Sequence, residues 1–107
     1  MAFPDDHVAL TSLFGSSAVN NSGTLSIDLS ELPDVDNASS LTSTGIVLAL
    51  IRAIQDNQGS DDDRKIMMPA AGPDTTLITV GGVSALREAY TINIRDDFAS
   101  ELDPDSV

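Results

Sequence analysis

The chain has 107 residues, the length of one domain, and its 17 acidic and 5 basic side chains give a net charge of -12. Nucleic-acid backbones and anionic membrane surfaces repel such a charge, so we expect no direct contact with either. The absence of cysteine excludes a disulfide framework and a thiolate metal site.

The N-terminal third predicts one short helix and one strand. A helix capped by Asp5 or Asp6 is expected to end at Gly15, with its apolar residues on one stripe. Residues 24–30 alternate strictly between polar and apolar, a pattern typical of a half-buried strand that Pro33 then ends.

The middle of the chain predicts one substantial helix. Ser39 or Ser40 is expected to cap it, and it should run to about Gln58, before the stop at Gly59. Its core-facing stripe is predicted to contain Val47, Leu50, Ile51 and Ile54, widened by Leu48.

Three strands are predicted after this helix. Residues 66–68 form a short one, and residues 75–80 and 86–95 form two longer ones around a glycine turn. A two-residue loop, Gly81-Gly82, would split the apolar residues between both faces of this hairpin. A loop of three residues, 81–83, instead gathers six of them on one face: Ile78, Val80, Leu86, Tyr90, Ile92 and Ile94.

We predict the three-residue loop, because a single buried face specifies the register of a hairpin strongly. Glu88 then falls on the apolar face, so it should lie at an edge or be covered by a partner. The far half of the second strand, residues 90–94, has no local partner. It is expected to pair with residues 25–29 or with another subunit, because an unpaired apolar edge is a liability.

These elements predict an α+β fold: a small antiparallel sheet of three or four strands, including a long hairpin, with one main helix packed on it. Residues 1–107 are predicted to form a single domain, with an acidic C-terminal tail from about residue 96.

No residues suggest a catalytic constellation, so we expect no enzyme and no cofactor. The single histidine, His7, lacks a placed nucleophile and a third group. Asp61, Asp62 and Asp63 are weak candidates for a hard-cation site, but three consecutive carboxylates cannot all point inward, and a solvated loop is favoured.

The composition favours a structural or assembly subunit of a larger particle, a homo-oligomer that also contacts other structural proteins. The particle we expect is a virion, with this chain as a capsid-decorating, connector or tail protein adapted to high salt. The predicted interaction residues are Leu86, Tyr90, Ile92, Ile94, Asp96 and Asp97.

Two other functions stay open. An acidic mimic of nucleic acid could inhibit a DNA-binding enzyme, although that requires regularly spaced charges on one rigid face. A small divalent-cation-binding domain is the second alternative. The expected location is a virion or another intracellular particle, with the cytoplasm as the alternative, because the acidic start does not resemble a secretory signal.

Overall fold

The computed structural model describes residues 8–59, 65–69, 72–95 and 102–105. In chain order these residues form α1 (Leu10–Phe14), β1 (Val19–Asn21), β2 (Thr24–Ser26), the 3₁₀-helices η1 (Leu29–Glu31) and η2 (Ala38–Ser40), α2 (Ser43–Asn57), β3 (Ile66–Met67), β4 (Asp74–Val80), β5 (Val83–Ala89) and β6 (Asn93–Ile94).

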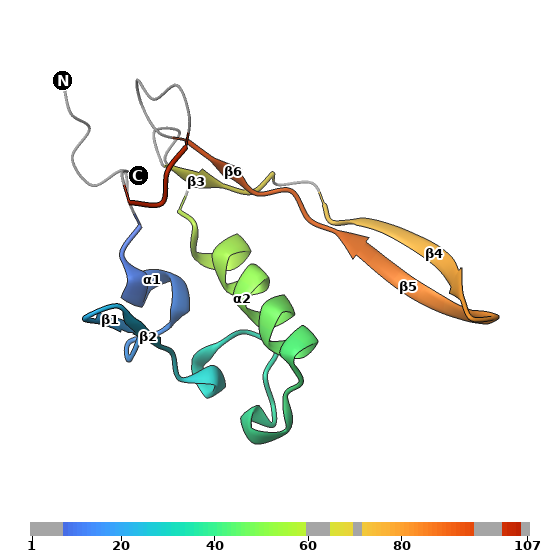
Figure 1. Ribbon diagram of the computed structural model, residues 1–107, viewed down its shortest axis with the longest axis horizontal. Coiled ribbons are helices and arrows are strands. Elements are labelled where there is room, and N and C mark those ends of the chain that lie inside the picture. Colours follow the sequence, from blue (N-terminus) through green and yellow to red (C-terminus); the bar gives the residue numbers. More distant parts are fainter. Residues whose placement is uncertain (1–7, 60–64, 70–71, 96–101, 106–107) are drawn as a thin grey trace.

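The predicted α+β class is confirmed, with one main helix and antiparallel strands that include a long hairpin. The described strands form three separate two-stranded sheets, β1–β2, β3–β6 and β4–β5, and not one sheet of three or four strands. The N-terminal elements lie on one side of α2, whereas the β4–β5 hairpin points away from the rest of the molecule (Figure 1).

The helix α2 begins later than the sequence suggested. Its N-cap is Thr42, whose Oγ1 accepts a hydrogen bond from the backbone N–H of Gly45 at 3.1 Å. The predicted caps, Ser39 and Ser40, lie in η2 and bond locally to Asn37. Several small polar residues precede this helix, and each one favours a cap, so composition alone could not select Thr42.

The core is small and lies on one side of α2. Its buried members are Leu32, Ala49 and Ala53, and five partly buried residues pack against them: Phe14, Ile27, Leu29, Val35 and Leu50. Of the predicted stripe, Leu50 joins this cluster, whereas Val47 is exposed. Alanines therefore form the closest contact of the helix with the N-terminal elements, and its larger apolar residues are spread around its circumference.

The predicted strand at residues 24–30 is shorter and more exposed than expected. It ends at Ser26, all three positions of β2 are exposed, and the chain turns into η1. Asp28 caps η1, because its Oδ1 accepts hydrogen bonds from the hydroxyl and the N–H of Ser30. The hydrogen bond from the Ser30 hydroxyl is the main cause of the lowered pKa of Asp28. A local aspartate cap has thus replaced the end of the strand.

The β4–β5 hairpin has the two-residue loop, so the predicted three-residue register is wrong. Val80 pairs with Val83, and Leu77 with Leu86. Gly81 and Gly82 have φ of 58° and 80°, and two positive φ values are the signature of a type I′ turn, whose twist matches that of the strands. Ile78 and Leu86 consequently lie on opposite faces. The sequence argument required one buried face, and neither face of this hairpin is buried.

The end of the long predicted strand pairs within the chain. Ile94 pairs with Ile66, Asn93 pairs with Met67, and the N–H of Arg95 donates to the carbonyl of Lys65 at 2.8 Å. Residues 93–94 therefore pair with β3 and not with residues 25–29, whereas pairing of this segment with another subunit stays a prediction.

A buried glutamine fixes β3 to the end of α2. Gln58 Nε2 donates to the carbonyls of Gln55 and Met68, both at 3.2 Å, and Gln58 Oε1 accepts from the N–H of Met68. Both Gln58 and Met68 are buried, so this side chain satisfies backbone groups that water cannot reach.

The molecule is extended for its size. Its radius of gyration is 16.1 Å, compared with about 13 Å for a compact domain of this length. It exposes 7663 Å², which is roughly 2,000 Å² more than a compact monomer of its mass exposes. Within the described ranges, no helix has both the length and the apolar character needed to cross a membrane.

Candidate interaction surface

The β4–β5 hairpin exposes a long apolar surface. Each strand has seven residues, so the hairpin spans roughly 24 Å. Most of the surface of four large apolar side chains along it is exposed: Leu77 (76%), Val80 (62%), Val83 (67%) and Leu86 (63%). Leu77 and Leu86 pair on one face of the hairpin, and Val80 and Val83 pair on the opposite face. Isolated apolar residues on a surface are ordinary, but exposed apolar pairs on both faces of one projecting element are typical of an interaction site.

The same segment carries no charge. From Thr75 to Leu86 every residue is apolar, glycine, serine or threonine, in a chain whose net charge is -12. Charged residues on edge strands normally prevent pairing with other chains. Their absence between Thr75 and Leu86 leaves this part of both outer edges open to contact, whereas Asp74, Arg87 and Glu88 lie at the root of the hairpin.

An isolated two-stranded hairpin is only marginally stable in water, because it buries too little apolar surface. Most positions of β4 and β5 are exposed, and only Ile78, Ala85 and Glu88 are half-buried. The hairpin therefore gains little from the rest of the chain, and contact with another surface would stabilise it.

An open groove of about 370 Å³ lies beside the root of this hairpin. We call it the α2 groove, and it is lined by Ser43, Thr44, Val47, Leu48, Ile51, Glu88 and Tyr90. The helix contributes three apolar side chains and two small hydroxyls, and the exit of β5 contributes the opposite wall. Only Glu88 among the lining residues is charged.

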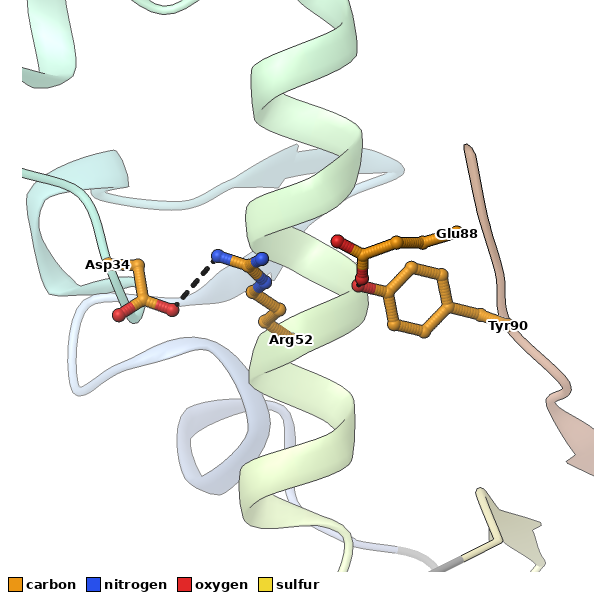
Figure 2. Close-up of polar contacts among 4 residues, drawn as sticks. All are labelled: Asp34, Arg52, Glu88 and Tyr90. Carbon is orange, nitrogen blue, oxygen red and sulfur yellow. Dashed lines mark hydrogen bonds and ion pairs between the residues drawn. The ribbon is translucent and has the colours of Figure 1, made fainter. Parts of the chain in front are cut away.

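Polar side chains lie on both sides of α2 near the groove (Figure 2). The Tyr90 hydroxyl donates to Glu88 Oε2 at 2.7 Å, and Arg52 Nη1 lies 3.1 Å from Asp34 Oδ2 on the other side. Hydrogen bonding with Tyr90 is the main cause that raises the pKa of Arg52, and the bond to Glu88 raises the pKa of Tyr90. Such partly exposed contacts contribute little stability.

The structure separates the predicted interaction residues. Leu86 lies exposed on β5, and Tyr90 lies half-buried just beyond it, in the wall of the groove. Ile92 is exposed between β5 and β6, and Ile94 is exposed in β6. The four residues do not share one strand face, because β5 ends at Ala89.

Several predicted sites fall outside the described residues: Asp61, Asp62 and Asp63 of the candidate cation site, Asp96 and Asp97 of the interaction set, His7, and most of the predicted acidic tail. In the part of the chain that the structure describes, no group of three or more histidine or acidic side chains could hold a metal ion.

Sequence reasoning missed the groove. Val47, Leu48 and Ile51 were assigned to the core, because helical periodicity identifies an apolar face but not what covers it. The contact of Tyr90 with Glu88 had a weak signal in the isolated acidic residue on the strand. Nothing in the sequence pointed to Arg52 or Gln58.

Comparisons of the chain with protein-family models, with curated proteins and with solved structures find no match.

Proposed function

We propose that this chain is a non-enzymatic structural subunit that self-associates through the β4–β5 hairpin within a larger protein particle. The observation that carries the proposal is the hairpin itself, which projects from the molecule with four exposed apolar side chains and no charge from Thr75 to Leu86.

The net charge supports contact at this segment. Copies carrying a charge of -12 repel one another, so close approach costs least where neither surface is charged.

For the particle we propose a virion, in which the chain is a capsid-decorating, connector or tail protein that also contacts other structural proteins. A salty environment would suit it, since the Debye length falls to about 3 Å at 1 M salt and the repulsion between copies is then screened. The test is mass spectrometry of particles purified at high salt from its host. Recovery of the chain from the soluble fraction alone would contradict this part of the proposal.

Self-association is tested by light scattering of the full chain at low salt and at about 1 M salt. We expect a defined oligomer that becomes more populated as salt rises. A variant with Leu77→Thr and Leu86→Thr keeps charge and strand propensity but should be monomeric, because it removes the exposed leucine pair. Leu25→Thr, at another exposed leucine of a short hairpin, is the matched control and should associate like the wild type. A wild-type monomer at every salt concentration overturns the proposal.

A further inference from the structure

We infer that the α2 groove of one copy receives the β4–β5 hairpin tip of a second copy of this chain. The inference rests on the proposed self-association and names the surface that the hairpin meets. Its parts are the tip residues Val80 and Val83 and, on the receiving side, the helix face that carries Val47 and Ile51.

The hairpin does not fill the groove of its own copy. Glu88 and Tyr90, at the exit of β5, form a wall of that groove, and the hairpin leads from this wall away from the body of the molecule (Figure 1). The bond from the Tyr90 hydroxyl to Glu88 lies at the root of the hairpin, beside the groove. A hairpin that occupies this groove would therefore come from another copy.

The two surfaces match in chemistry. The tip presents Val80 and Val83 around two glycines, whose Cα positions have open space around them, so the tip is narrow and apolar. The groove presents Val47, Leu48 and Ile51 and is open on one side. An apolar cavity of about 150 Å³ admits one benzene ring, and this groove, at about 370 Å³, has room for two valine side chains.

Each copy in such a contact contributes a hairpin to one neighbour and a groove to the same or another neighbour. Charge does not oppose the contact, since Glu88 is the only charged group in the tip or the groove and it already accepts a bond from Tyr90.

The test is a complementation experiment with two charge-neutral variants of the full chain. The tip variant carries Val80→Thr and Val83→Thr, which preserve volume and strand propensity but require two hydroxyls to be buried in the groove. The groove variant carries Val47→Gln at a position that is 55% exposed, so it should fold normally. Val19→Gln, at a valine that is 47% exposed on β1, is its matched control.

Each variant alone should associate at least about 30-fold more weakly than the wild type, because burial of unpaired polar groups opposes the contact. An equimolar mixture should form a heterodimer, since the intact tip of the groove variant fits the intact groove of the tip variant. Val19→Gln should assemble like the wild type. These associations are measured by sedimentation velocity, with one variant fluorescently labelled.

Two outcomes would overturn the inference while leaving self-association in place. In the first, the groove variant assembles like the wild type, as it would if hairpins paired edge to edge. In the second, both variants fail to associate and their mixture remains monomeric. A wild-type chain that stays monomeric would instead overturn the proposed function itself, so the two failures are distinguishable.

Discussion

Thr42 satisfies a backbone donor at the start of α2, because its Oγ1 accepts a hydrogen bond from the N–H of Gly45. We predict that Thr42→Ala lowers the free energy of unfolding by about 1 kcal/mol, as is typical for loss of an N-cap. Ser39→Ala, at a residue that the sequence suggested as the cap, should cost less. Urea denaturation of both variants measures the difference, and a larger loss at Ser39 would contradict the cap assignment.

Tyr90 is the chain's single tyrosine and there is no tryptophan, so its ionisation is visible in the ultraviolet spectrum. Its hydrogen bond to Glu88 raises its pKa above the ordinary value of 10.0. We predict that Glu88→Gln lowers the midpoint of the tyrosine titration toward that value, because the neutral amide does not oppose ionisation. Glu31→Gln, which removes a carboxylate that bonds Ser16 and Ser17 instead, should leave the midpoint unchanged.

The sign of the accompanying stability change follows from the raised pKa. The neutral Tyr90 hydroxyl is favoured in the folded state, so its contribution is fully present below pH 10 and is lost as pH rises through the folded-state pKa. Between pH 10 and the folded-state pKa of Tyr90, the free energy of unfolding should therefore fall more steeply in the wild type than in Glu88→Gln. Equal slopes for the two proteins would show that the bond to Glu88 does not form in solution.

The contact between α2 and β3 depends on Gln58. We predict that Gln58→Ala lowers the free energy of unfolding by at least about 2 kcal/mol, because the buried N–H and carbonyl of Met68 lose their partner. Gln55→Ala is the matched control at the same helix end, since Gln55 uses its backbone carbonyl in this contact and should cost much less. Similar losses for both would assign the effect to helix propensity.

At the level of elements, the sequence was informative where a pattern extends over several turns. The helix α2 was predicted because its apolar residues recur over 15 positions before Gly59. The hairpin was predicted from two β-rich segments around Gly81-Gly82, but not its register, because the register rule requires a buried face and this hairpin has none. The pairing of β3 with β6 was missed, since two-residue strands show no periodicity.

The candidate site was predictable only in part. The sequence predicts Leu86, on the hairpin, and Tyr90, in the wall of the groove, because apolar residues on a strand without enough local partners suggest intermolecular contact. The helix side of the groove was not predictable, since Val47 and Ile51 have the same spacing whether they face a core or solvent. How the N-terminal elements pack decides which of the two they face. Here they pack against Ala49 and Ala53, and this leaves the larger side chains beside the groove.

At the scale of the whole molecule, two properties act against each other. The charge of -12 disfavours the compact state and the approach of copies, whereas the exposed apolar hairpin favours association. The core contributes little to the free energy of unfolding, because no large side chain among the described residues is fully buried. Salt should therefore strengthen both folding and assembly, by screening repulsion that neither the core nor the interface removes.

We predict that the free energy of unfolding rises with sodium chloride up to about 1 M, where the Debye length is about 3 Å, and then levels off. The measurement is made with Val80→Thr and Val83→Thr present, so that association does not contribute. Adding Asp36→Asn, Asp56→Asn and Asp74→Asn removes three exposed carboxylates and reduces the charge from -12 to -9. This variant should be more stable at low salt and should respond less to salt, because less repulsion remains to be screened. If its stability rises with salt as steeply as that of its parent, the salt effect does not come from charge repulsion.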